Sequence, residues 1–197
     1  MNKFAFGAAF AALAAAVPAA APAQRLGAAV VAVIDTGRIF RDCNACKTAQ
    51  TQLQQQVDQA RQRAQQLGQP LQTEGQSLEN AIKALGGKAP DAALQQRIQG
   101  FQTRQNTANQ ELQNRQGTIQ RNQQFVAQQI NTKLDPIIKS VMQNRGANIA
   151  VDMQATLAAS PSIDVTNDVL AQLNQQLTTV SVNAPAAPAN AQQPQGR

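Results

Sequence analysis

The chain contains two cysteines, Cys43 and Cys46, in the stretch RIFRDCNACKTAQ. A Cys-x-x-Cys spacing occurs in thiol oxidoreductases, in metal sites and in short structural disulfides. A redox centre needs the motif at the start of a helix on a βαβ scaffold, whereas the residues downstream have the pattern of a coiled coil. A zinc site would be half empty in one chain, because there is no histidine and no second cysteine pair. Residues i and i+3 of a helix lie about 5 to 6 Å apart, which favours a structural disulfide without turnover.

The other reactive groups do not match a known catalytic pattern. The lack of histidine excludes Ser-His-Asp triads and imidazole bases. The sequence Gly86-Gly87-Lys88 is followed by Ala89 rather than by Ser or Thr, and it lacks the earlier glycine of a phosphate-binding loop. The eleven carboxylates are scattered along the chain. We therefore expect that the protein is not an enzyme and has neither a catalytic site nor a metal or cofactor.

The N-terminal residues 1–23 have the features of a secretory signal peptide. Lys3 precedes an apolar run, and Ala21-Pro22-Ala23 has the small residues that signal peptidase requires, which predicts cleavage after Ala23. The apolar run ends at Pro18, so it is shorter than the ~20 residues needed to span a bilayer. These features predict a secreted protein.

Three short segments have strand character. Residues 28–34 and 147–152 are rich in β-branched and apolar residues, and residues 155–160 are a third candidate that Pro161 stops. Residues 28–42 and 145–180 are therefore predicted to form a small β-rich body. We expect its assembly between chains, since such short strands cannot bury both of their faces in one chain. The residues expected in this assembly surface are Val31, Val33, Ile34, Ile149, Val151 and Leu157. On this hypothesis, Val33→Asp would dissociate the oligomer and leave the helices largely intact.

The segments after the strands have a different character. A helix is predicted after residue 165, with Thr166 as its N-cap and Asp168 in its first turn. The last residues, 181–197, are mostly Pro, Ala and Gln and are predicted to be disordered.

Residues 43–144 are predicted to form an α-helical hairpin arm with its tip at 86–91. Apolar residues recur with alternating spacings of three and four on both sides of the Gly-Gly-Lys-Ala-Pro-Asp turn. In an antiparallel pair, facing residues have a constant sum of residue numbers. A sum of 179 aligns all layers, so that Leu67 faces Leu112 and Leu78 faces Phe101. The aligned series are Val57, Ala60, Ala64, Leu67, Leu71, Glu74, Leu78, Ala81 and Leu85, facing in the same order Asn122, Ile119, Arg115, Leu112, Ala108, Gln105, Phe101, Ile98 and Leu94.

Nearer the body, both series change to a spacing of four, with Ala45, Ala49 and Leu53 in the first helix. The second helix continues as Val126, Ile130, Leu134 and Ile138. Pro136 follows Asp135, a combination that is typical of a helix start, so a kink or a restart is predicted there.

The charge of the chain is basic, with a formal net charge of +6. Residues 42–145 carry 12 Lys and Arg against 7 Asp and Glu, which favours acidic proteins or anionic lipids as partners. Nucleic acid is not expected, because the protein is secreted and has few aromatic residues for base stacking. The alternative is an ordinary solvated helix face. The arm residues considered for electrostatic capture are Lys83, Lys88, Arg97, Arg104, Arg115 and Arg121.

In two stretches, VAVIDTGRIF and ANIAVDMQATLAASPSIDVTNDVLAQLN, the chain resembles the Skp/OmpH family of periplasmic chaperones. The family pattern has an opening strand followed by an Asp motif, a coiled-coil arm, a returning strand that ends in Asp, and a short end helix. The resemblance covers residues 31–177, and the matching positions are Asp35, Ile39, Phe40, Asp152, Asp164, Val165, Thr166, Val169 and Leu170. The Cys pair, the high Gln content, Pro70 and the C-terminal tail depart from the pattern.

The resemblance implies an α+β fold in which a long antiparallel coiled-coil hairpin projects from a small β-strand body. It implies a periplasmic homotrimer whose arms surround a cavity and hold unfolded outer-membrane β-barrel proteins without ATP. An alternative is a coiled-coil adaptor or spacer of the cell envelope that binds a folded partner, an anionic lipid or lipopolysaccharide.

Overall fold

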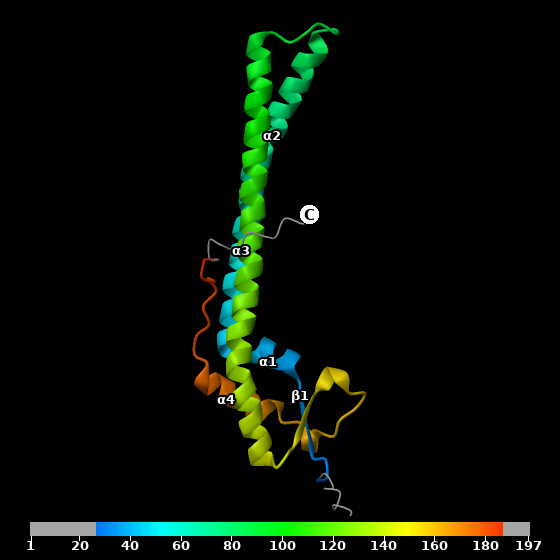
Figure 1. The fold of residues 1–197 in the computed structure, drawn as a ribbon, viewed down its shortest axis with the longest axis vertical. Coiled ribbons are helices and arrows are strands. Elements are labelled where there is room, and N and C mark those ends of the chain that lie inside the picture. The colour runs from blue at the N-terminus through cyan, green and yellow to red at the C-terminus, as the bar shows by residue number, and fades with distance from the viewer. Residues whose placement is uncertain (1–26, 187–197) are drawn as a thin grey trace, which may run out of the picture.

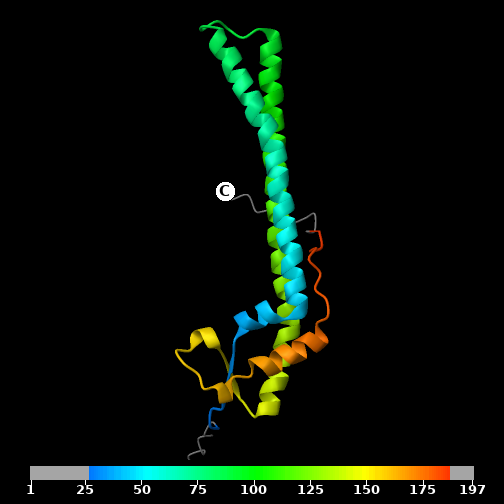
Figure 2. The ribbon, with the colours of Figure 1, turned by 180° about the vertical axis from the view of Figure 1, so that it is seen from behind.

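The computed structural model describes residues 27–186, and it consists of a long helical arm on a small body (Figures 1 and 2). The order of elements is β1, α1, α2, α3, β2, η1, η2 and α4, where η1 and η2 are single turns of 3₁₀ helix. This architecture confirms the predicted α+β fold of a helical hairpin on a small β-strand body. The predicted signal peptide, residues 1–23, lies outside the described residues.

The body contains one parallel pair of strands, β1 (Val31–Ile34) and β2 (Ile149–Asp152). Val31 pairs with Ile149 and Ile34 with Asp152, so the whole arm is the connection between two neighbouring strands. The predicted third strand at 155–160 is wrong. It is replaced by the 3₁₀ turns η1 (Met153–Ala155) and η2 (Pro161–Ile163) with a loop between them.

Local side-chain hydrogen bonds explain why no third strand forms. The carboxylate of Asp152 accepts a bond from the Gln154 backbone N–H at 2.7 Å, and this bond begins the η1 turn. Ser160 caps η2 in the same way, with Pro161 as the first residue of that turn. Such bonds satisfy the backbone locally and compete with pairing in a sheet. The only ladder contact in this region of the described structure is a single bridge between Asp164 and Val33.

A short helix that the sequence reading missed, α1 (Thr36–Asp42), leads from β1 to the arm. Asp35 is its N-cap and accepts a hydrogen bond from the Arg38 N–H at 2.7 Å. Cys43 ends α1 and is also the N-cap of the following helix. Asp is a strong N-cap residue, so a signal for this helix was present in the sequence.

The arm is formed by α2 (Asn44–Ala84) and α3 (Ala92–Arg145), as predicted. At the tip, Gly86 and Gly87 have φ values of 55° and 90°, which side-chain-bearing residues rarely adopt. Asp91 then caps α3 by accepting a hydrogen bond from the Leu94 N–H at 2.8 Å. The predicted restart at Pro136 is wrong, because α3 is continuous there. The buried residues Leu134 and Ile137 hold this part of the helix against the body.

Two polar pairs across the arm agree closely with the predicted register, whereas the longer side chains of Arg63 and Arg97 reach Glu111 and Ser77 at a sum of 174. Gln56 bonds to Asn122 and Glu74 to Arg104, and each pair has a residue-number sum one below the predicted 179. Leu78 and Phe101 line a common groove. Arg115, which is exposed, bonds to Glu111 on its own helix. The facing of Leu67 and Leu112 stays a prediction.

The lower arm and the body share one hydrophobic core. It combines Ala32 and Ile34 of β1 with residues of α1, the helix roots and α4 (Thr166–Gln176). Of the predicted spacing-of-four residues, Ala45, Ala49, Val126, Ile130 and Leu134 are buried in this core; Leu53 and Ile138 pack at its edge. Ile137, rather than Ile138, is the buried residue of its turn, with 1% of its surface exposed.

The Asp and Thr residues shared with the Skp/OmpH pattern join the segments of the body. The Thr36 hydroxyl donates to the Asp152 carboxylate, and this hydrogen bond lowers the pKa of Asp152. The Thr166 hydroxyl accepts from the Asp35 N–H at 2.9 Å and donates to Asp164. Thr166 is therefore not the N-cap of α4 as predicted. It is the first residue of the helix, after Val165, and is fully buried.

Among residues 27–186, no helix is long and apolar enough to cross a membrane.

Candidate functional site

The two helices of the arm, α2 and α3, diverge toward the tip (Figures 1 and 2). One groove of about 530 Å³ there has largely apolar walls that include Leu78, Ile82, Ile98 and Phe101. A second groove of about 320 Å³, lower on the arm, is lined in part by Leu67, Leu71 and Ala108. Both grooves are shallow and accessible. They can bind apolar side chains of a flexible polypeptide, but they do not enclose a small molecule.

The body presents apolar side chains to solvent. Of the large hydrophobic residues that are exposed in the described structure, Val30, Ile149, Leu157 and Ile163 belong to the body, and only Ile82 belongs to the arm. Leu157 is fully exposed, and Ile149 is 42% exposed on β2. The far edge of β2 is also open, since the two-stranded sheet has the order β1–β2 and Asp164 bridges to β1. An open edge beside apolar side chains is typical of a surface that another chain covers.

The residues predicted for the assembly surface separate into two groups. Val33 and Ile34 are buried within their own chain, with 1% and 2% of their surface exposed, whereas Val31 and Val151 are half-buried. Ile149 and Leu157 remain exposed. The expectation that β1 lacks covering layers is therefore wrong, because α1, α4 and the 153–164 segment cover it. Val33→Asp consequently cannot act on assembly alone.

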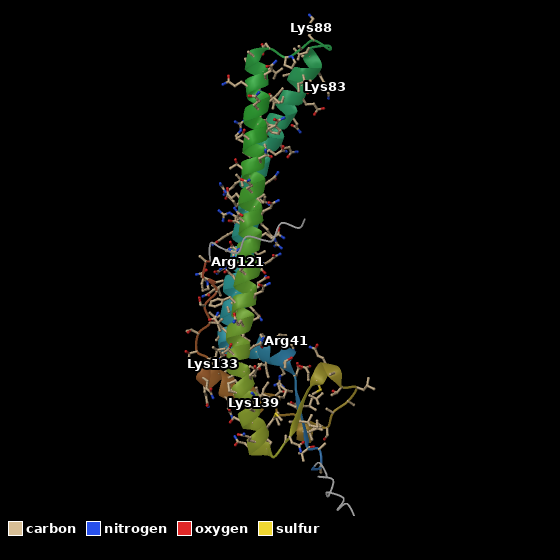
Figure 3. The ribbon with its side chains drawn as sticks, in the orientation of Figure 1. Arg41, Lys83, Lys88, Arg121, Lys133 and Lys139 are labelled. Carbon is tan, nitrogen blue, oxygen red and sulfur yellow. A yellow bond between two sulfur atoms is a disulfide. The ribbon has the colours of Figure 1, made fainter. Side chains whose placement is uncertain are left out.

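The six basic residues considered for capture do not form one patch. Three of them are neutralised in ion pairs, Lys83 with Glu79, Arg104 with Glu74, and Arg115 with Glu111. Arg97 donates to the Ser77 hydroxyl, and Arg121 donates to the Thr118 hydroxyl. Lys88, in the tip turn, makes no ion pair with any residue that the structure describes. Figure 3 shows basic side chains from Lys83 and Lys88 at the tip to Arg41 and Lys139 at the body.

Glu111 is the centre of a charged cluster halfway along the arm. Arg63 of α2 binds both of its carboxylate oxygens, at 2.8 and 3.0 Å, and Arg115 of α3 donates to it at 3.0 Å. These hydrogen bonds, Arg63 first, lower the pKa of Glu111 from an ordinary 4.5 to about 2. A carboxyl whose pKa falls on folding stabilises the fold above its unfolded pKa, and the contribution is lost as the pH falls through the folded value.

We expect an NMR pH titration to show Glu111 ionised down to about pH 2. Arg63→Gln should raise its midpoint toward 4.5, because the bidentate partner is lost. Arg61→Gln is the matched control, since Arg61 lies two residues away and pairs with Asp58. An ordinary midpoint in the parent chain would show that the Arg63–Glu111 bridge does not form in solution.

The two cysteines form a disulfide in the structure, with a Cα–Cα distance of 5.1 Å. Both are buried, with 0% and 1% of their surface exposed, at the corner between α1 and α2. The Cys43 sulfur also accepts a hydrogen bond from the Cys46 N–H at 3.2 Å, so it caps α2. Thiol–disulfide exchange needs access to a sulfur, which this burial denies.

We expect Cys43→Ser combined with Cys46→Ser to lower the free energy of unfolding by about 2 kcal/mol or less, because the closed loop is very short. Serine is also a good N-cap, so the start of α2 should persist. Urea unfolding followed by circular dichroism measures the change. Catalytic reduction of insulin disulfides by the parent chain would instead favour the redox interpretation.

A further set of polar residues was missed by the sequence reading. Gln56, Asn122 and Gln129 hold the segment that follows α4 against the arm. The prediction of disorder is therefore wrong for residues 181–186, and residues 187–197 lie outside the described part. The available signals were Asn122 at a seam position, where it is 4% exposed, and the alternation of Val180 and Val182 with polar residues.

Comparisons with known proteins agree with this architecture. The family described as outer membrane protein (OmpH-like) matches residues 30–173. The chain is 28% identical over 149 residues to the chaperone protein Skp of Yersinia enterocolitica, over 74% of this chain and 87% of the relative. Its fold is similar to the crystal structure of an OmpH-like protein from Caulobacter crescentus, with a TM-score of 0.65 and 20% identity over 80% of this chain and 90% of that one. Since the family match runs from β1 into α4, the resemblance is confirmed and the chain belongs to the OmpH-like outer membrane protein family.

Proposed function

We propose that the protein is an ATP-independent periplasmic holdase that binds unfolded outer-membrane β-barrel proteins and prevents their aggregation. The observation that carries this proposal is the arm. An apolar groove near its tip is accessible to solvent, whereas the helices pack into the hydrophobic core lower down. Many weak apolar contacts on a long arm suit a client without fixed structure. The match to a chaperone over most of both chains supports the same function.

The cage would be built by several copies of the chain, and a homotrimer is the form we propose. A single hairpin cannot surround a client. The exposed residues Ile149 and Leu157 and the open edge of β2 lie at the base of the arm, where copies could join. Isolated two-stranded sheets are marginally stable, so pairing between chains would also stabilise the body. The arms would then project from a common base.

Aggregation of a β-barrel protein tests the proposed function. An outer-membrane protein unfolded in urea is diluted into buffer without ATP, and light scattering is followed with and without equimolar chain. We expect strong suppression by the parent chain and weaker suppression by Ile82→Ser combined with Phe101→Ser, which makes the tip groove more polar. Ala84→Ser with Ala93→Ser, at exposed positions of the same region, is the matched control. Unchanged scattering with the parent chain would refute the holdase.

We further propose that the basic excess of the arm speeds the capture of acidic clients. The association rate should fall as ionic strength rises from about 0.01 to 0.15 M, because the Debye length falls from about 30 to 8 Å. Lys88→Gln should slow association more than Lys139→Gln if clients are met first at the tip (Figure 3). Stopped-flow fluorescence with a labelled client measures both effects, and a salt-independent rate would leave apolar contacts as the only source of capture.

The dispersed basic residues give less support to the adaptor alternative. Anionic lipid or lipopolysaccharide would be bound best by a cluster of unpaired Lys and Arg. Here, three of the six candidate residues are already ion-paired, and the labelled basic side chains extend from the tip to the body.

A further inference from the structure

The segment after α4 runs back along the arm in an extended form (Figures 1 and 2). We call residues 178–186 the strap. Val180 and Val182 pack against the hydrophobic core, while Ser181 between them and Asn183 after them are exposed. This alternation is that of a β-strand with one face on an apolar surface.

The arm holds the strap through hydrogen bonds to its backbone. The Gln129 side-chain amide binds both backbone polar groups of Ser181. Its Oε1 accepts from the Ser181 N–H at 3.1 Å, and its Nε2 donates to the Ser181 carbonyl at 2.8 Å. Gln129 thus takes the place of a paired strand residue. Farther along, Asn122 accepts from the Ala184 N–H at 2.9 Å.

These amides are held in place by one another and by burial. Asn122 is 96% buried and donates to the Gln56 Oε1 at 2.8 Å. Gln56 in turn donates to the Val182 carbonyl at 3.4 Å and lies 3.5 Å from the Asn183 side-chain oxygen. Apart from that last contact, all of these bonds to the strap are made to its main chain, so they do not depend on which side chains the strap carries.

The same groove continues past the strap toward the tip. A hollow of about 720 Å³ starts at Asn183 and is lined by more amide and hydroxyl groups. These are contributed by Gln59, Thr107, Gln110, Asn114 and Thr118, with Ala60 and Ile119 as apolar members and the ion-paired Glu111 and Arg115 as charged ones. The described part of the strap fills only the end of this groove that lies nearest the body.

We infer that this Gln- and Asn-lined groove is a binding site for an extended polypeptide strand with alternating small apolar side chains, whose backbone is bound by the amides of the groove. The strap occupies this site as a ligand from the same chain. The strap then competes with the incoming strand. Transmembrane β-strands alternate apolar and polar residues in the same way, so an unfolded β-barrel protein supplies suitable segments. The identity of that natural ligand rests on the proposed function, whereas the peptide site does not.

The test uses the full chain with Val180→Asp and Val182→Asp, which lifts the strap because charges cannot stay against the core. The probe is a fluorescein-labelled, end-blocked peptide with the sequence of residues 178–186. Fluorescence anisotropy should show saturable binding to this variant and at least about tenfold weaker apparent binding to the parent chain, where the tethered strap competes at an effective concentration in the millimolar range.

Two matched comparisons test recognition of the backbone. The same peptide N-methylated at the residues equivalent to Ser181 and Ala184 should bind about tenfold more weakly, because two donors are lost. Adding Gln129→Met to the lifted variant should have a similar effect, whereas Gln128→Met, at the exposed neighbouring position, should have none. A peptide of alternating Val and Ser should bind within about threefold of the strap peptide, and one with the same residues in blocks should not.

A second variant protects the test from misfolding. Ser181→Pro with Ala184→Pro removes two backbone donors of the strap and restricts its backbone angles, but it changes neither the groove residues nor the two valines. It should also bind the peptide more tightly than the parent chain does. The inference is overturned if neither variant shows saturable binding, or if N-methylation and Gln129→Met change nothing. Peptide binding without suppression of aggregation would refute the holdase and keep the site, and the reverse result would keep the holdase and refute the site.

Discussion

Val33→Asp is expected to lower the free energy of unfolding by about 3 to 5 kcal/mol, because it places an unpaired carboxylate in the interior of the body. Val33 has 1% of its surface exposed, and its carbonyl accepts the Val165 N–H at 3.0 Å. Its backbone is paired on one side with β2 and on the other with Asp164, in the segment that returns to α4. The loss is a large share of the roughly 5 to 15 kcal/mol that is typical of a domain.

Urea unfolding followed by circular dichroism measures this loss. Ala29→Asp is the matched control, because Ala29 is exposed four residues earlier and the same charge should cost little there. A parent-like midpoint for Val33→Asp would mean that Val33 is not buried in the body of the folded chain.

Ile149→Asp combined with Leu157→Asp should dissociate the oligomer and leave the fold of each chain intact. Both side chains are exposed in the single chain, so neither carboxylate is buried by the chain's own fold. In an assembly of identical chains, the new charges would be buried or brought close to one another. We expect the dissociation constant to rise about a thousandfold or more, which corresponds to about 4 kcal/mol.

Analytical ultracentrifugation at micromolar concentration distinguishes the two states. The parent chain should sediment as an oligomer and the double variant as a single chain with unchanged helical content. Ile82→Asp controls for the chemistry, since Ile82 is 47% exposed but lies near the tip of the arm. An unaltered oligomer in the double variant would place the assembly surface elsewhere on the molecule.

The hairpin could be predicted from sequence because its determinants are local and periodic. The apolar spacing predicted both helices, and Gly86 and Gly87 marked the tip. The predicted sum of 179 for the residue numbers of facing residues is within one of the observed sum for Gln56 with Asn122 and for Glu74 with Arg104. The predicted restart at Pro136 is wrong because contacts with the body hold α3 together across a residue that weakens an isolated helix.

The body and the strap were harder to predict because their contacts join residues far apart in sequence. Thr166 is predicted to be a cap, but its hydroxyl bonds to Asp35, 131 residues away. Val33 is predicted to lie in an assembly surface, whereas its own chain buries it, with β2 and Asp164 as its backbone neighbours more than 100 residues away. The composition of 181–197 predicted disorder, whereas Gln129 and Asn122, more than 50 residues away, bind the backbone of its first residues.

Native mass spectrometry of the chain mixed with an unfolded outer-membrane β-barrel protein tests the proposed cage most directly. The account predicts a complex of one client with several copies of the chain, three in the form proposed here, formed without ATP and absent for Ile149→Asp with Leu157→Asp. A complex with one copy of the chain, or none with the client under conditions in which the parent chain is folded, would contradict it.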